Sequence, residues 1–480
     1  MMDFRDIAFG YTSAEAERSN DPGLLVDGYT DFKNASEQAI SGSRFLFLGY
    51  KGAGKSTIGE HLQLKLGDKF DCFVKPIALS DFPFTPFSKI IRGDAEPEHK
   101  YPAAWSWILL IHVLESLASD KGLTHPRMNE LHDAQSAFRK MGLSPSGSPA
   151  TIVRTTAKNS FKLSLPGSLA QYEWSGSDTR PASDIPDFVE SLKTLICEAQ
   201  TNSFHYLIID GLDDILTSRE VQFKSLSALV FEVDRLNKIF RDSSLNVKII
   251  LLCRTDMYEK VPGANKNKTR HDYAIELDWY HDTNDPGNSL LVDLARRRAT
   301  RSLARECDVF KEFFVGQIKG KPIEKFLLDM TRHTPRDFLQ LLSSIQQFYD
   351  GTRMKDIQVN SGMREYSIKY FLPEIRDELS GYAQPDEISQ IVSALARLRK
   401  REFSFHELVM ASADLAKPLG KERVYELCQL LFECSALGHI ESRNSGTTHY
   451  TFKFRNRQAS FNELDKIMLH RGLWKALNVI

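Results

Sequence analysis

One short segment constrains the fold of this chain more than any other. It runs Gly49-Tyr-Lys-Gly-Ala-Gly54-Lys55-Ser56, between an apolar run at Phe45–Leu48 and a helical pattern at Thr57–Leu66. Glycines let a strand-to-helix turn curl so that its backbone N–H groups and the positive end of the helix face an anion. The segment therefore predicts a phosphate-binding loop, called the P-loop below.

The spacing of the P-loop assigns a role to several of its side chains. Lys55 is expected to reach the β- and γ-phosphates of a nucleoside triphosphate, and the Ser56 hydroxyl is expected to hold Mg²⁺. A glycine-rich turn that happens to contain a lysine is the alternative, which the flanking strand and helix disfavour. The residues expected to contact ATP in this segment are Gly49, Lys51, Gly52, Ala53, Gly54, Lys55, Ser56 and Thr57.

A group of carboxylates follows a second apolar strand. The run Tyr206–Ile209 leads directly into Asp210-Gly-Leu-Asp213-Asp214. Ligands of open α/β sheets bind at the carboxyl ends of the strands, so Asp210 is expected to orient Mg²⁺ there. Asp213 or Asp214 could polarise the attacking water. The alternative is a capping and turn cluster, because Asp and Gly are common after strands.

A third apolar strand ends in an arginine. Val247–Leu252 leads into Cys253-Arg254-Thr-Asp256, and the helical pattern at Leu226–Phe240 supplies the crossover from the second strand. Short apolar runs without alternation are typical of central strands in a parallel sheet covered on both faces. Arg254 could contact the γ-phosphate or its product, or it could pair with Asp256, and both interpretations stay open.

Composition and periodicity divide the chain into further regions. The predicted boundaries are a leader at 1–43, an α/β core at 44–280, a helical lid at 281–380 and a winged helix at 381–480. Within the core, 142–186 is rich in Ser, Pro, Gly and Thr and is interpreted as an insertion, in which Ser160–Trp174 has strand character. Residues 288–348 are predicted to be wholly helical.

The C-terminal region combines helices with a pair of strands. Arg397, Arg399, Lys400 and Arg401 cluster at the end of its first helix. This cluster is compatible with DNA binding, but the region as a whole is less basic than most domains that read DNA. Helices followed by a two-stranded wing predict a winged-helix domain. The predicted elements are helices at Glu387–Leu398, from His406 and at Lys421–Cys434, and strands at Gly438–Ser442 and His449–Phe454.

The charge balance and the termini exclude several classes of protein. Lys and Arg total 62 and Asp and Glu 63, a formal net charge of -1, which excludes a highly basic nucleic-acid coat and an acidic solvating tail. The amino terminus lacks the basic and apolar regions of a secretory signal, and no apolar run approaches the roughly 20 residues of a membrane span. The sequence therefore predicts a cytoplasmic protein with no membrane partner.

The second motif carries a resemblance to a known family. The sequence IIDGLDD at 208–214 is similar to the Walker B motif of the STAND and NACHT branch of AAA+-type ATPases. Ordinary AAA+ proteins place Glu directly after the first Asp, where this chain has Gly211. The resemblance implies that Asp213 and Asp214 assist hydrolysis and that Arg254 belongs to a sensor 1 region.

Two further basic segments are candidates for contact with a nucleotide or with DNA. Thr334-Pro335-Arg336-Asp337 resembles the start of the AAA+ lid helix, in which an arginine senses the nucleotide, and Pro335 suits a first helical turn. The alternative is a helix cap with a surface arginine. The stretch Ala295–Arg298, with Arg301 and Arg305, could supply an arginine finger or contact DNA phosphates, but a solvated charged helix is the simpler interpretation.

The layout as a whole, a P-loop NTPase sheet followed by a helical lid and a winged helix, resembles bacterial AAA+/STAND-type ATPases of anti-phage defence loci. It implies a switch that binds and hydrolyses ATP with Mg²⁺, forms a homo-oligomer and acts with a separately encoded effector such as a nuclease. One alternative is a DNA-binding ATPase similar to Orc/Cdc6-type replication initiators, with DNA held by the winged helix. Another is a degenerate nucleotide binder that serves as a scaffold.

Overall fold

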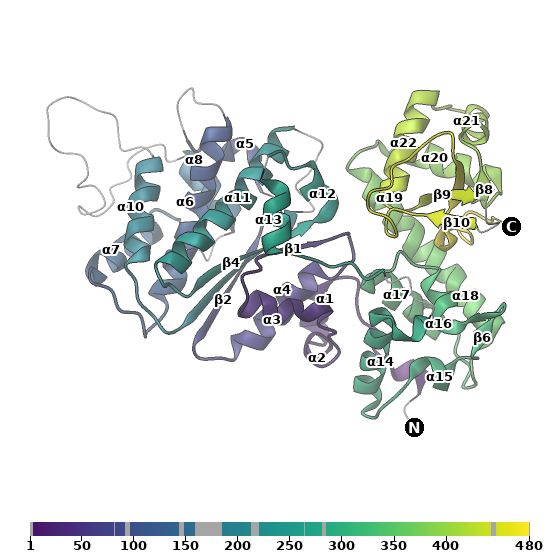
Figure 1. The fold of residues 1–480 in the computed structure, drawn as a ribbon, viewed down its shortest axis with the longest axis horizontal. Helices are drawn as coiled ribbons and strands as arrows, with labels where there is room; N and C mark the ends of the chain where they lie inside the picture. Colours follow the sequence, from purple (N-terminus) through teal and green to yellow (C-terminus); the bar gives the residue numbers. More distant parts are fainter. Residues whose placement is uncertain are drawn as a thin grey trace. The chain divides into compact units, whose positions relative to one another are not determined.

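The contacts of the chain divide it into two units (Figure 1). The core unit contains Asp31–Lys51 and Lys55–Leu277, and the helical unit contains Met1–Thr30, Gly52–Gly54 and Asp278–Ile480. The computed structural model describes residues 3–80, 82–91, 97–143, 148–158, 185–212, 220–263, 265–280, 285–442 and 448–479. The strand character predicted for Ser160–Trp174 falls outside the described residues.

The core unit is built on a five-stranded parallel sheet in the order β2-β3-β4-β1-β5. Strands β1, β3 and β4 match the three apolar runs described above, and β2 matches a further strand that the sequence predicts at Asp71–Leu79. The fifth was not predicted, because three half-buried residues make no recognisable apolar run. The strands are β1 (Leu46–Gly49), β2 (Cys72–Ala78), β3 (Phe204–Asp210), β4 (Val247–Arg254) and β5 (Ala274–Glu276).

Helices cover both faces of this sheet (Figure 1). Leu207 and Leu251 belong to the hydrophobic core that α6 and α11 complete on one face. On the other face α4 packs closely, since a Cβ added to Gly59 would lie 3.2 Å from Leu252 and 3.4 Å from Ile208. Consecutive residues of β3 and β4 thus serve two cores, which explains why these central strands are largely apolar.

One helix of the core unit begins two residues before its predicted start. The helix after the P-loop begins at Lys55, whereas the pattern predicts Thr57 as its start. The described helices of this unit are α3 (Ala35–Ile40), α4 (Lys55–Gly67), α5 (Phe84–Phe87), α6 (Pro97–Ala118), α7 (Met128–Lys140), α8 (Pro149–Lys158), α10 (Ile185–Cys197), α11 (Glu220–Asp242), α12 (Thr255–Lys260) and α13 (Lys266–Tyr273). In the described part of the chain, no helix is long and apolar enough to cross a membrane.

The sequence predicts that residues 288–348 are wholly helical, and the structure differs from this prediction. A short antiparallel ladder joins β6 (Gln317–Ile318) to β7 (Lys321–Pro322). The turn between them holds Lys319 at φ 52° and Gly320 at φ +75°, the left-handed pair that a tight hairpin needs. The helices around it are α14 (Leu290–Leu303), α15 (Val309–Phe313), α16 (Ile323–Leu328), α17 (Pro335–Gln346), α18 (Asp356–Tyr366) and α19 (Leu372–Ser380).

The leader contributes to both units. Its first part, with α1 (Ala14–Asn20) and α2 (Gly23–Val26), belongs to the helical unit, and α3 belongs to the core unit. Phe4 is fully buried, with its ring centroid 5.2 Å from that of Phe313 and 5.5 Å from that of Phe314. The first residues of the chain therefore complete a hydrophobic core of the helical unit.

The C-terminal part combines three helices with a four-stranded antiparallel sheet in the order β10-β9-β11-β8. The sequence predicts the strands β9 and β10 but misses β11, a four-residue strand that lies between β9 and β8. The predicted turn of the wing at 444–446 lies outside the described residues. The elements are α20 (Pro385–Leu398), α21 (Phe405–Ala413), α22 (Lys421–Glu433), β8 (Glu402–Phe403), β9 (Leu437–Ser442), β10 (Thr448–Thr451) and β11 (Lys466–Leu469).

Candidate functional site

The three sequence motifs of the core unit follow neighbouring strands and end at one edge of the sheet. Strand β4 lies between β1 and β3, and the parallel register sets Gly49 beside Arg254 and Ile209 beside Leu251. The P-loop after β1, Arg254 at the end of β4 and Asp210 at the end of β3 therefore share the carboxyl edge of the sheet. This edge is where ligands of open α/β sheets bind.

The P-loop has the backbone conformation that its glycines allow. Gly52 has φ +80° and Gly54 has φ +91°, both in the left-handed region that side chains disfavour. Helix α4 starts at Lys55, so Ser56 and Thr57 lie in its first turn, where N–H groups lack partners within the helix. The loop and the helix end together form a ready site for an anion.

Lys55 is the buried cation of this loop. Its side chain folds back so that Nζ donates to the carbonyl oxygen of Gly49 over 3.1 Å and to that of Tyr50 over 3.3 Å. The residue is only 5% exposed. The ammonium group is therefore held against the backbone of the P-loop, where the sequence predicts the phosphates.

Arg254 forms a bidentate ion pair with Asp256. Nε of Arg254 lies 2.9 Å from Oδ1 of Asp256, and the second contact to Oδ2 is 2.8 Å. Burial alone would raise the pKa of the Asp256 carboxyl, but the charges of Arg254 and Lys55 hold this pKa below its usual value. The pairing that the sequence left open is thus present, and it brings Asp256 into the site as a residue that orients Arg254.

Asp210 ends strand β3 in a tight turn. Its Oδ1 accepts the Gly211 N–H at 2.8 Å, and its carbonyl oxygen accepts the Leu79 N–H at 2.8 Å. Gly211 has φ +82°, and a Cβ at this position would lie 2.9 Å from the backbone nitrogen of Ser80. The glutamate that ordinary AAA+ proteins carry here would collide with the residues after β2. Asp213 and Asp214 lie outside the described residues.

Helix α17 carries the arginine predicted for the lid. Thr334 caps the helix by accepting the Asp337 N–H at 3.2 Å, a contact that is compatible with either interpretation of Arg336. The Arg336 side chain is partly exposed and lies 3.8 Å from Glu374. Within the helical unit, which includes Gly52–Gly54, the Arg336 N–H also donates to the Gly52 carbonyl oxygen at 3.4 Å.

A buried charge cluster fixes the start of α17. Asp337 is fully buried and accepts hydrogen bonds from Arg332 at 2.9 and 3.1 Å and from the Tyr370 hydroxyl at 2.9 Å. Arg332 also pairs with Glu378 of α19. Burial alone would raise the pKa of Asp337, but the Arg332 charge holds it below its usual value. The backbone that carries Arg336 is therefore anchored by charge as well as by its cap.

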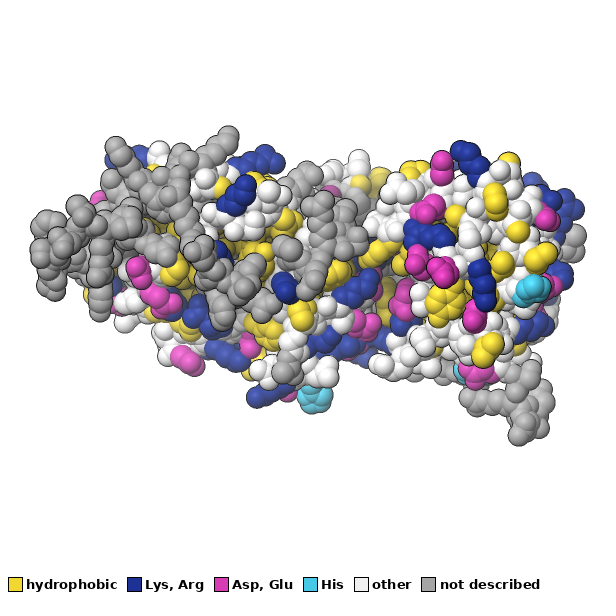
Figure 2. Space-filling model, turned by 90° about the horizontal axis from the view of Figure 1, so that it is seen from above, with side chains coloured by type: hydrophobic (Ala, Val, Ile, Leu, Met, Phe, Trp, Pro, Cys, Tyr) yellow, Lys and Arg dark blue, Asp and Glu magenta, His cyan; other side chains and the backbone are white. Residues whose placement is uncertain are grey.

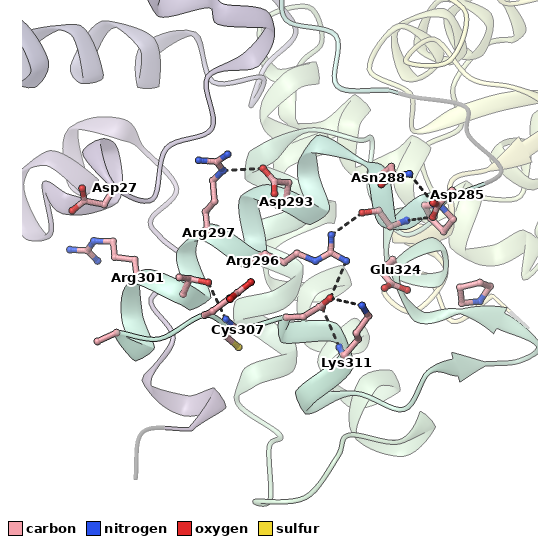
Figure 3. Close-up of a pocket in the computed structure, with 17 residues that line it drawn as sticks. Asp27, Asp285, Asn288, Asp293, Arg296, Arg297, Arg301, Cys307, Lys311 and Glu324 are labelled. Carbon is pink, nitrogen blue, oxygen red and sulfur yellow. Dashed lines mark hydrogen bonds and ion pairs between the residues drawn. The ribbon is translucent and has the colours of Figure 1, made fainter.

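The arginines of α14 are engaged within the helical unit. Figure 3 shows Arg297 directed at Asp293 and Arg296 among the side chains of a cavity of about 1190 Å³. Arg298 is buried and pairs with Glu17 of the leader at 2.6 and 3.0 Å. These contacts favour a charged helix bound to its own unit over an arginine finger. The remaining pairs are Arg296–Asp308, Arg301–Asp21 and Arg305–Glu312.

Comparison with known proteins gives one family match and several similar structures. Residues 289–372 match the model of a FunZ-associated C-terminal helical domain. No curated protein matches the chain.

Three solved structures resemble the chain at low sequence identity. The Orc1 protein of Aeropyrum pernix in complex with DNA is 13% identical, with 96% of each chain covered and a TM-score of 0.40. A Walker-type ATPase of Pyrococcus abyssi is 11% identical, with 88% of this chain and 92% of that one covered and a TM-score of 0.38. Cdc6p from Pyrobaculum aerophilum is 12% identical, with 100% and 97% covered and a TM-score of 0.31. At these TM-scores the similarities carry no further conclusion.

The Asp256–Arg254 pair predicts a pH-dependent stability. We expect Asp256→Asn to lower the free energy of unfolding at neutral pH by about 2 kcal/mol, because Arg254 loses a charged acceptor. The lowered pKa of Asp256 means that the carboxylate stabilises the fold above its unfolded-state pKa of about 4, and that this contribution is lost as the pH falls further. Urea unfolding over a pH series measures the difference.

The control for this experiment is Asp242→Asn, which removes an exposed carboxylate at the end of α11. This variant should follow the wild type at every pH. The interpretation fails if the difference between wild type and Asp256→Asn stays constant as the pH falls below about 4.

Proposed function

We propose that this chain binds and hydrolyses ATP as a molecular switch of the AAA+ type, with the Walker B form of the STAND and NACHT branch. The observation that supports this most is the position of the P-loop, Asp210 and Arg254 at one edge of the sheet. A triphosphate is a small, highly charged anion, so a backbone cradle and one lysine suffice to bind it without a basic surface.

The residues of the P-loop would each contact a different part of ATP and its Mg²⁺ ion. Backbone N–H groups from Gly52 to Thr57 would face the phosphates, and Lys55 would neutralise charge on the β- and γ-phosphates. Ser56 and Asp210 would hold Mg²⁺, since hydroxyl and carboxylate oxygens are the ligands that this hard cation prefers. When bound, Mg²⁺ would neutralise phosphate charge further.

Hydrolysis would use the carboxylates after β3 and the arginine after β4. Asp213 or Asp214 would accept a proton from the attacking water. Arg254, oriented by Asp256, would stabilise the charge that develops on the γ-phosphate. Arg336 would sense the nucleotide from α17, whose start the Arg332–Asp337 cluster holds in place.

A DNA-binding, initiator-like ATPase is the alternative, and the charges of the C-terminal region argue against it. Helix α22, which precedes the wing, has two cations: Lys421 lies 3.9 Å from Glu463, and Arg423 lies 2.7 Å from Glu387. Figure 2 shows a face on which cationic side chains of the helical unit are interspersed with carboxylates rather than gathered in a patch. Domains that read DNA usually present a basic stripe.

The switch would act through assembly and through a partner. We propose that ATP binding promotes a homo-oligomer, that hydrolysis reverses it, and that a separately encoded effector, a nuclease or another enzyme, delivers the output. We place this switch in bacterial anti-phage defence on the resemblance of the whole layout to ATPases of defence loci. Under this proposal the winged helix packs and switches rather than binding DNA.

The first prediction concerns the P-loop lysine. Lys55→Ala should lower the rate of phosphate release from ATP by about a hundredfold or more, because it removes the cation nearest the transferred phosphate. The matched control is Lys65→Ala, an exposed lysine on the same helix, which should keep the wild-type rate. A wild-type chain without ATPase activity, or a Lys55→Ala variant with full activity, would contradict the proposal and leave the scaffold interpretation.

The second prediction concerns assembly. With ATP present, light scattering should report a larger mass for the wild type than without ATP, and Lys55→Ala should show no such change. If the mass distribution of the wild type does not respond to ATP, the chain is not an ATP-driven assembly switch, even if it hydrolyses ATP.

The third prediction concerns the biological setting. In a bacterial host that expresses the chain from its native locus, phages should form fewer plaques than in a host that expresses Lys55→Ala. Equal plating across a panel of phages would remove the defence role without affecting the proposed ATPase chemistry.

A further inference from the structure

A second cavity of the helical unit lies between α18 and the C-terminal residues and has a volume of about 960 Å³. Ile357 and Arg364 contribute from one face of α18, two helical turns apart. Arg399 contributes from the end of α20, and Trp474 and Lys475 contribute from the C-terminal segment. We call these five residues and the cavity they line the C-terminal pocket.

The cations of the C-terminal pocket lack the ion pairs that other cations of this region have. Within the described parts of 385–479, only Arg399, Arg401 and Lys475 lie more than 3.9 Å from every carboxylate oxygen. Arg364 on α18 likewise has no ion-pair partner among the described residues. The paired cations are Arg397, Lys400, Lys417, Lys421, Arg423, Lys453, Arg455, Arg457, Lys466 and Arg471.

The pocket also holds one carboxylate, and its neighbourhood adds a further cation. Asp356 accepts a hydrogen bond from Asn360 at 2.6 Å, so it is satisfied by its own helix. The Arg401 guanidinium lies 4.4 Å from the centre of the Trp474 ring, and the Trp474 indole donates to the Leu469 carbonyl oxygen at 2.9 Å. The pocket and its edge thus hold four cations, Arg401 included, and one carboxylate, beside an indole that a hydrogen bond holds in place.

The backbone of Arg399 has an unusual conformation for a residue with a side chain. It ends α20 with φ 50°, in the left-handed region that usually favours glycine or asparagine at this position. A non-glycine residue there carries a conformational cost of roughly 1 kcal/mol. The neighbouring Lys400 and Arg397 pair with Glu407 and Asp414, so Arg399 is the one of these three cations that lines the pocket without an ion pair among the described residues.

The pocket has an apolar component that a phosphate ligand would not use. Ile357 is 74% exposed and lies among the lining residues. Strands β9 and β10 carry no Lys or Arg within their described residues, and both cations of α22 are paired. A nucleic acid would need a broader set of phosphate contacts than this pocket provides. Carboxylates next to an apolar side chain would match both components.

We propose that the C-terminal pocket binds an acidic segment of a partner protein. Carboxylates of that segment would pair with Arg364, Arg399 and Lys475, and an apolar side chain would cover Ile357. Charge complementarity supports this occupant, because these cations form no ion pair with the described carboxylates of the chain and outnumber the one carboxylate in the lining. None of these residues belongs to the nucleotide site, so the inference does not depend on ATP hydrolysis.

The test is fluorescence anisotropy of the full chain with a short labelled peptide composed of Glu and Leu, at low salt. Arg399→Gln and Lys475→Gln should each weaken binding about threefold to fivefold, and the double variant about tenfold. Ile357→Ser should weaken it by a similar factor. The matched control is Lys400→Gln, which makes the same charge change beside Arg399 at a paired lysine and should leave binding unchanged.

Further arms distinguish this inference from the alternatives. A peptide with Gln in place of Glu should not bind, and Lys55→Ala should bind the Glu and Leu peptide as the wild type does. Absence of peptide binding, or binding that Lys400→Gln weakens as much as Arg399→Gln, would overturn the proposal. So would labelled duplex DNA that binds more tightly than the peptide, loses affinity in Arg399→Gln and is unaffected by Ile357→Ser.

Discussion

The parallel pairing of β3, β4 and β1 is the constraint on which the candidate site depends. The register sets Gly49 beside Arg254, and it brings the end of β3 to the same edge, although the segments are far apart in sequence. A shift of one residue would turn each side chain to the opposite face and exchange the two cores of the sheet. The packing that buries the strands on both faces therefore also places the P-loop, Asp210 and Arg254 together.

The motifs made much of the core predictable, and the unpredicted parts have physical reasons. A glycine-rich loop between an apolar run and a helix, and two more apolar runs, indicate strands β1, β3 and β4, because these three strands are buried on both faces. Strand β5 was missed because its three half-buried residues form no apolar run, and β11 was missed because its apolar run, Ile467–Leu469, is only three residues long. Asp256 was considered only as a partner of Arg254. Its place in the site follows from a bidentate contact that spacing alone does not establish.

Charge pairing within the helical unit explains how a nearly neutral chain can contain so many arginines. Arg298 is buried against Glu17, and Arg332 joins Asp337 to Glu378, so these cations tie separate segments together rather than forming a basic surface. Losing one partner of such a buried pair leaves an uncompensated charge and is strongly destabilising. The first residues of the chain and the α17 region are thus coupled to the stability of the whole unit.

The turn at Gly211 limits which substitutions this site could accept in evolution. The Gly211 backbone is left-handed, and a Cβ added to it would lie 2.9 Å from the Ser80 backbone nitrogen. A single substitution to Glu at this position would disturb the exit of β2 before it could supply a carboxylate. An ATPase with this parallel pairing of β2 and β3 would therefore take its hydrolytic acid from residues further along, and the two forms of the motif would differ by a change of backbone as well as of one residue.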